Sequence, residues 1–283
     1  MSFRNKSIIV ILYTLVSFVV FNQFSRIDTL LLYPLRSADA FLNQSPFITI
    51  NNIIIQQPSS SILILLLALI TILLGVEYLY YRTSKLSIWL GINFIFWGLG
   101  AFLAGLSYQS FGYYYKCVGF EACTFTHWVE LLYMSFTVLS INALLVSYSY
   151  SIDSSKIKTF IRYFSLRSVV MYSIFQGFGM ILPNQFMVSY EGMLVFLSPN
   201  IIIMMWISFK HIKEDLHKKL WILWILFLGV NIAYFVALFA QQGPYLYLNF
   251  KIWFNENDTL HVFLALWMLI WRWMIPPKGN FKE

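Results

Sequence analysis

Long apolar runs separated by short polar connections dominate the sequence. Eight such runs are present, at 7–21, 61–81, 86–112, 128–150, 166–182, 188–209, 220–241 and 259–275. A helix needs roughly 20 apolar residues to cross a bilayer, and lipid offers no partner for an exposed backbone amide. We therefore expect every run to be helical and the chain to fold as an all-α, polytopic transmembrane helical bundle of about eight spans.

The first run differs from the others in its surroundings. Arg4 and Lys6 precede it, as in a signal sequence, but no small-x-small cleavage site follows, so an uncleaved anchor is expected. The stretch after it is broken by three prolines yet apolar enough to lie on the membrane face. The predicted division is an N-terminal transmembrane anchor at 1–24, an extracytoplasmic amphipathic connection at 25–60, a seven-helix core at 61–275 and a cytoplasmic tail at 276–283.

Composition supports the membrane assignment. Hydrophobic residues make up 59% of the chain and charged residues 11%, whereas soluble domains average about 25% charged residues. The net charge of +7 does not indicate a nucleic-acid partner, because no basic run is interleaved with aromatic side chains. Membrane lipids are the expected partners, together with a lipid or small-molecule ligand.

The basic residues also predict the orientation. Four of the 19 Lys and Arg residues, Arg26, Arg36, Lys116 and Lys251, fall in one alternating set of connections, and all the others fall in the opposite set. Cytoplasmic loops carry the excess of Lys and Arg. Both termini are therefore predicted to be cytoplasmic, and a bacterial inner membrane is the expected location.

Two cysteines, Cys117 and Cys123, lie in a connection that this topology places outside. If that side is oxidising, the five intervening residues allow a small disulfide-closed loop. In a reducing environment the two would be unpaired thiols.

Ionisable groups gather at the predicted outer ends of several helices. Two histidines and a carboxylate, His127, His261 and Glu256, could hold a catalytic zinc with one position left for water. Carboxylate and histidine pairs also form proton relays in transporters. The catalytic candidates are His261, Asp258, Ser107 and Tyr108, and the other polar groups at this side are Gln109, Ser110, Glu130 and Glu191.

Each of these groups also has a structural interpretation. Asp258 or Asn257 suits the N-cap of the last helix, and acidic residues in a first turn favour the helix dipole by roughly 0.3–1 kcal/mol. His127, which precedes Trp128, could be an interfacial anchor. Neither interpretation is excluded by the spacing alone.

The run Cys117-Val-Gly-Phe-Glu-Ala-Cys123, with Trp128, Glu130, Asp258 and His261 downstream, resembles bacterial multi-span membrane proteins to which no activity is attached. More distantly, Ser107 and the His261 that opens the last helix make the last seven spans similar to the seven-helix membrane hydrolases that group alkaline ceramidases with progestin and adiponectin receptors. That resemblance implies a serine, an aspartate and histidines around zinc. Position 265 is Ala, so the zinc motif is incomplete.

Three functional classes follow from these observations. The first is a metal-dependent lipid or amide hydrolase with an outward-facing His/carboxylate site. The second is a non-enzymatic transporter or sensor that binds a small ligand through the same groups, and the third is a structural membrane protein. A retinal protein is a poor fit, because no lysine occurs between Thr259 and Trp271 to form a Schiff base.

Overall fold

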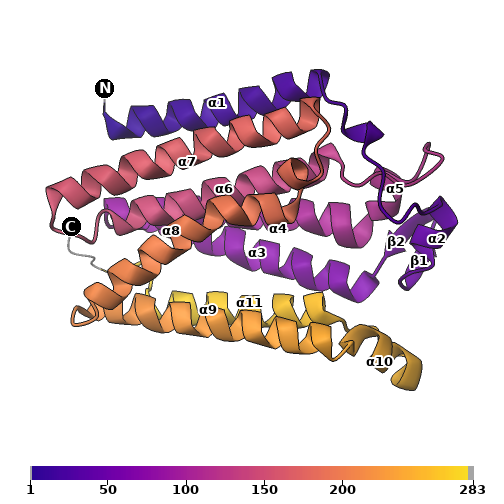
Figure 1. Ribbon diagram of the computed structural model, residues 1–283. Helices are drawn as coiled ribbons and strands as arrows, with labels where there is room; N and C mark the ends of the chain where they lie inside the picture. Colours follow the sequence, from indigo (N-terminus) through magenta and orange to yellow (C-terminus); the bar gives the residue numbers. More distant parts are fainter. Residues whose placement is uncertain (1, 280–283) are drawn as a thin grey trace.

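The structure is a computed structural model that describes residues 2–279, so residues 280–283 of the predicted tail lie outside the described residues. Eight long helices run side by side along one direction, with α8 the most tilted (Figure 1). Each of the eight apolar runs has become a helix. Their bounds are α1 Phe3–Gln23, α3 Pro58–Tyr81, α4 Lys85–Ala104, α6 Trp128–Tyr148, α7 Ser155–Ile181, α8 Tyr190–Lys210, α9 Asp215–Phe239 and α11 Glu256–Met274.

Six of these helices are long and apolar enough to cross a membrane, namely α1, α3, α6, α8, α9 and the continuous helix Lys85–Ser110 that begins with α4. The other two carry more charge: α7 has four basic residues in its first half, and α11 has two acids in its first turn and Arg272 in its last. The protein is thus an all-α helical bundle of integral membrane type.

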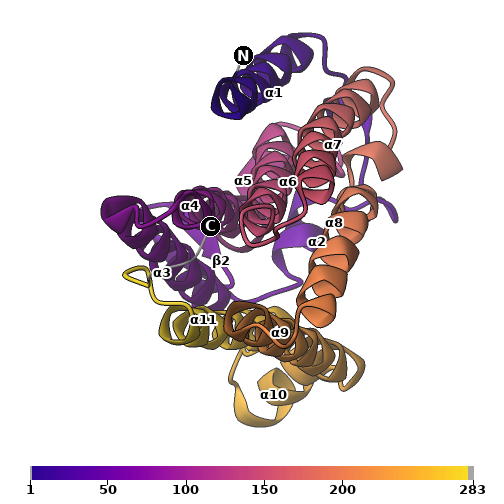
Figure 2. The same cartoon turned by 90° about the vertical axis from the view of Figure 1, so that its left-hand side faces the viewer.

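Six of the long helices form a closed ring. In order around it, α3 contacts α4, α4 contacts α6, α6 contacts α8, α8 contacts α9, α9 contacts α11, and α11 returns to α3. Helices α1 and α7 pair with each other outside this ring, against α6, as the view along the bundle shows (Figure 2). The first helix therefore packs against α7 and α6.

Close backbone contact joins α3 to α4. A Cβ on Gly75 would lie 2.8 Å from the backbone nitrogen of Ile95 and 2.9 Å from the carbonyl oxygen of Gly91. Small residues let helix backbones approach in membranes, where packing and not hydrophobic exclusion drives association. These two glycines therefore set the distance between the two helices.

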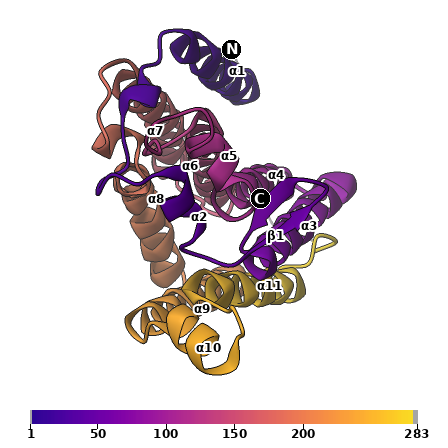
Figure 3. The ribbon, with the colours of Figure 1, turned by 90° about the vertical axis from the view of Figure 1, so that its right-hand side faces the viewer.

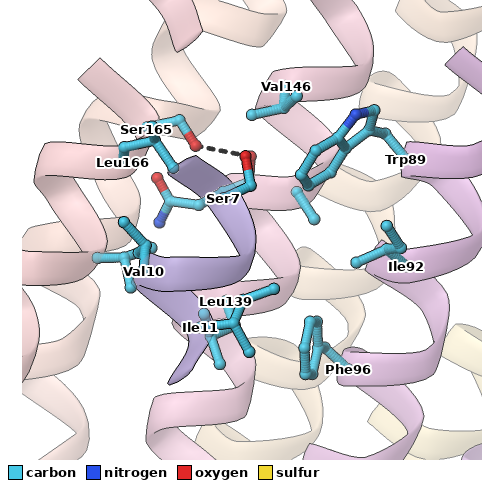
Figure 4. A pocket seen from close by; sticks show the side chains of 13 residues that line it. Ser7, Val10, Ile11, Trp89, Ile92, Phe96, Leu139, Val146, Ser165 and Leu166 are labelled. Carbon is cyan, nitrogen blue, oxygen red and sulfur yellow. Dashed lines mark hydrogen bonds between the residues drawn. The ribbon is translucent and has the colours of Figure 1, made fainter. Parts of the chain in front are cut away.

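A small apolar cleft marks where α1 packs on the rest of the bundle (Figure 4). Val10 and Ile11 of α1 lie on one side of it and Trp89 and Phe96 of α4 on the other. Its volume of about 20 Å³ has room for about one water molecule. It is a packing gap and not a ligand site.

The connection after α1 contains short elements of regular structure. It contains the short helices η1 (Ile27–Thr29) and α2 (Ala38–Leu42) and a two-stranded antiparallel hairpin of β1 (Phe47–Ile50) and β2 (Ile53–Gln56). Asn51 and Asn52 turn the hairpin at φ angles of 48° and 66°, left-handed values that asparagine tolerates well.

The hairpin, α2 and α5 (Gly112–Lys116) lie over one end of the helices (Figure 3). At the same end, η3 (Phe186–Val188) precedes α8, and α10 (Gln242–Phe250) follows α9 and leaves the large apolar side chains of Tyr245, Leu248 and Phe250 exposed. The start of α1 and the end of α11 lie at the opposite end of the bundle (Figure 1).

Candidate functional site

A cavity of about 570 Å³ opens at the end of the bundle that carries the hairpin, and we call it the vestibule. Segments far apart in the sequence form its wall: α2 and the turn after it, β2, the π-helical turn Gly105–Ser110 that ends α4, the end of α9, and the approach to α11. Its lining residues are Phe41, Gln44, Ser45, Gln56, Gln57, Tyr108, Leu238, Gln241, Pro244, Trp253, Asn255, Glu256 and Asn257.

The vestibule wall consists mainly of uncharged polar side chains and aromatic rings. Carboxamides and aromatic rings dominate the lining, Glu256 is its one carboxylate, and neither lysine nor arginine contributes to it. The buried Nε1 of Trp253 has no hydrogen-bond partner among the described residues. A second hollow of about 320 Å³ shares Gln44, Ser45 and Trp253 with the vestibule. The surface therefore offers many hydrogen-bond donors and acceptors to a polar molecule.

Helix α11 begins at the vestibule wall and continues inward. Asn255 and Asp258 form a reciprocal capping box: the Asn255 backbone nitrogen donates to Asp258 Oδ2 at 2.9 Å, and the Asp258 nitrogen donates to Asn255 Oδ1 at 3.0 Å. Asp258 is buried, and the Ser60 side chain of α3 lies beside its carboxyl group. The N-cap of α11 is thus Asn255 and not Asp258 or Asn257 as predicted, and Asp258 takes part as the third residue of the capping box.

His261 lies one turn deeper on the same helix. It is buried, and its Nδ1 has no hydrogen-bond partner among the described residues. A buried polar atom in this state costs stability unless water or a ligand satisfies it. Asp258 and His261 are thus two buried polar groups near the start of α11, one helical turn apart as their spacing of three residues predicts.

A buried ion pair lies on the other side of the vestibule. Lys116 Nζ lies 2.6 Å from Glu130 Oε1, the Thr126 hydroxyl donates to Glu130 Oε2 at 2.9 Å, and the Lys116 ammonium sits 4.8 Å from the centroid of the Tyr108 ring. Tyr108 also packs edge to face on Tyr133. Because Tyr108 lines the vestibule as well, it links the cavity to the ion pair.

His127 serves as the N-cap of α6. Its Nδ1 accepts a hydrogen bond from the Val129 backbone nitrogen at 3.4 Å, and its ring stacks on Tyr115 at 4.8 Å. Burial lowers the pKa of the His127 imidazole, with Lys116 acting in the same direction and Asp28 opposing it. The neutral ring, which keeps Nδ1 available as an acceptor, is therefore the form that the fold favours.

The remaining predicted residues take other positions. The Ser107 hydroxyl is buried and donates to the Leu103 carbonyl at 2.9 Å, one turn earlier in the same helix. Gln109 and Ser110 are also buried in the π-helical turn, whereas Glu191 is exposed at the start of α8. Cys117 and Cys123 are joined by a disulfide bond that closes the loop after α5.

The predicted metal ligands do not meet. Among the described residues, the one group of three or more His, Cys, Asp or Glu side chains whose ligand atoms lie within 4.8 Å of one another is His211, Glu214 and His217, in the α8–α9 connection. His127, His261 and Glu256 are not brought into such a group, since His127 is on α6 beside Tyr115 and the other two are on α11. Zinc at that set of residues has no support in the geometry.

Sequence reasoning missed Lys116 and the carboxamides of the vestibule wall. Lys116 could have been noticed because it precedes Cys117 and is the one basic residue in its connection. The hairpin could have been found from Asn51-Asn52 between two runs rich in isoleucine. Nothing along the chain marked Gln57 and Gln241 as neighbours of one cavity.

No protein-family model matches the chain, and no curated protein or solved structure matches it either.

Proposed function

We propose that this chain is an eight-span membrane protein, with both termini cytoplasmic, that binds a small polar ligand from the extracytoplasmic side, as a transporter or sensor. The vestibule carries this proposal, since its volume of about 570 Å³ lies within the range of roughly 300–1,000 Å³ typical of small-molecule sites. A wall rich in carboxamides suits a ligand with several hydrogen-bonding groups.

The distribution of charge supports the orientation. The end of the bundle that carries the vestibule holds only Arg26, Arg36, Lys116 and Lys251 of the basic residues in the described part of the chain. The opposite end holds the connections after α3, α6 and α8, which are rich in Lys and Arg. Retention of basic loops in the cytoplasm would place the vestibule outside.

Accessibility in intact cells tests this orientation. Gln241→Cys should react with a membrane-impermeant maleimide before permeabilisation, whereas Lys213→Cys in the α8–α9 connection should react only afterwards. The native cysteines form a disulfide and should give little background labelling. Labelling of Lys213→Cys alone in intact cells would reverse the assignment.

Ligand binding is tested with a matched pair of carboxylates. Glu256 lines the vestibule, and Glu121 is an exposed carboxylate of the outer loop that does not line it. Protein purified from its own membranes should carry a small polar compound, detected by mass spectrometry, that Glu121→Gln retains and Glu256→Gln loses. Equal retention by the two variants would contradict binding in the vestibule.

The hydrolase is a second candidate, and the unpartnered imidazole of His261 beneath the vestibule favours it. In that case His261 would act on a substrate or hold a metal together with Asp258. His261→Ala should then lower the zinc content of purified protein. Unchanged zinc content would rule the metal-dependent version out.

A further inference from the structure

The connection between α8 and α9 brings three ligand-type side chains together at the end of the bundle opposite the vestibule. His211 is the C-cap of α8, Glu214 is the N-cap of α9, and His217 lies in the first turn of α9. Their spacing of three residues each, across a tight turn, points all three side chains to one place. The imidazoles of His211 and His217 lie on either side of the Glu214 carboxylate.

The distances between the ligand atoms are those of a compact coordination shell. His211 Nδ1 lies 2.8 Å from Glu214 Oε1, and His217 Nε2 lies 3.8 Å from Glu214 Oε2. The Ser151 carbonyl oxygen, from the α6–α7 connection, accepts a hydrogen bond of 3.2 Å from His217 Nε2, whose proton a bound metal ion would replace. Zinc bonds of about 2.0–2.1 Å in a tetrahedron place neighbouring ligand atoms roughly 3.3–3.4 Å apart, in the middle of these separations.

Burial distinguishes this cluster from an ordinary charged turn. The His217 side chain is fully buried, and its Nδ1 has no hydrogen-bond partner among the described residues. The rings of His211 and His217 lie 5.1 Å apart at an interplanar angle of 37°. His211 is partly exposed and Glu214 is half exposed, so the cluster is open to an ion from solution while one ligand is held rigidly.

Two of the lysines near the cluster have partners of their own, which reduces their repulsion of a bound cation. Lys219 is paired with Asp215 at 2.6 Å, and the Lys210 ammonium lies over the Trp206 ring at 4.8 Å. The Glu214 carboxylate is the one acidic ligand, and neutral imidazole with carboxylate is a ligand set that zinc prefers.

We propose that His211, Glu214 and His217 bind a divalent zinc ion, with the Ser151 carbonyl oxygen available as a fourth ligand. The ion would join the ends of α8 and α9 to the α6–α7 connection, and so fasten three neighbouring helices of the bundle. This site is separate from the vestibule and does not depend on what the vestibule binds.

Cobalt replaces zinc as a spectroscopic probe in the test, because tetrahedral Co²⁺ absorbs visible light. Full-length protein in detergent, stripped with a chelator, should take up one Co²⁺ per chain with visible d–d bands that added Zn²⁺ abolishes. His211→Ala and Glu214→Gln should each weaken Co²⁺ binding at least tenfold. His127→Ala and Glu121→Gln, which alter a histidine and an exposed acid at the other end of the bundle, should leave it unchanged.

Glu214→Gln distinguishes a metal site from a turn held only by hydrogen bonds. Glutamine still accepts a hydrogen bond from His211 but is a poor zinc ligand. The absence of d–d bands in the parent protein, or equal Co²⁺ affinity in the parent and in both cluster variants, would overturn the proposal. Loss of the bands in His261→Ala together with their persistence in His211→Ala would also overturn it, because the ion would then be bound at the vestibule end.

Discussion

Lys116 and Glu130 form an ion pair of 2.6 Å in which the two side chains are 9% and 1% exposed. The pair joins the disulfide-closed loop after α5 to the first turn of α6. Removal of one partner of such a pair leaves an uncompensated buried charge. The pair is therefore the point at which the disulfide-closed loop is fastened to the helices.

Lys116→Met should lower the free energy of unfolding by about 3–5 kcal/mol, since Glu130 would be left buried without its cation. Asp215→Asn is the matched control, because it breaks the ion pair between Asp215, which is 80% exposed, and Lys219, which is 38% exposed. Loss of this exposed pair should cost less than about 1 kcal/mol. Thermal unfolding in detergent measures both changes. Similar losses in the two variants would show that burial does not strengthen the Lys116 pair.

Gly75→Ala should destabilise the bundle by about 1–3 kcal/mol, because the added Cβ would meet backbone atoms of α4 at 2.8 and 2.9 Å. Those atoms cannot move aside as a flexible side chain could. Gly229→Ala, in α9, is the control: its Cβ would meet nothing within 4 Å, and the helix propensity of alanine predicts no loss. Equal melting temperatures for the two variants would argue against close packing of α3 on α4.

How far the sequence predicts this fold depends on the kind of contact. The eight helical runs are predicted well, because a long apolar segment in lipid can satisfy its backbone only as a helix. The order of helices around the ring is not predictable in this way, since lipid-facing and ring-facing sides are both apolar and no periodicity separates them. Charge predicts which helix ends share a side of the membrane, and the chain order places Asp258 and His261 near the first turns of one helix.

The candidate site shows the same limit. Local patterns predict that Asp258 and His261 share one helix face and that a capping segment precedes the last helix, because both depend on spacing within one helix. The vestibule depends on Gln57, Tyr108 and Gln241, which come from three separate segments. The metal set of His127, His261 and Glu256 assumed that helix ends on one side converge, but His127 turns to Tyr115 and caps its own helix.

His127 makes stability depend on pH. Because burial lowers the pKa of its imidazole in the folded protein, the unfolded chain binds a proton first as pH falls. The stability contributed by the neutral ring is present above the unfolded pKa of about 6.5 and is lost as pH falls toward the folded value. The parent protein should therefore lose more thermal stability than His127→Asn between about pH 7.5 and pH 5.5, because asparagine caps the helix without titrating. An identical pH dependence would contradict this role.

The disulfide and the Lys116–Glu130 pair should prove energetically coupled. Lys116 precedes Cys117, and its carbonyl accepts a hydrogen bond of 2.8 Å from the Thr124 nitrogen, so the closed loop holds the lysine backbone in place. Replacement of both cysteines by serine should lower the free energy of unfolding by about 2 kcal/mol, the low end of the range typical of disulfides, because the loop is short. In that background Lys116→Met should cost less than in the parent, since a freed loop already weakens the ion pair that the substitution removes and lets water reach Glu130. A double-mutant cycle measures the difference, and additive losses would show that the loop and the ion pair act independently.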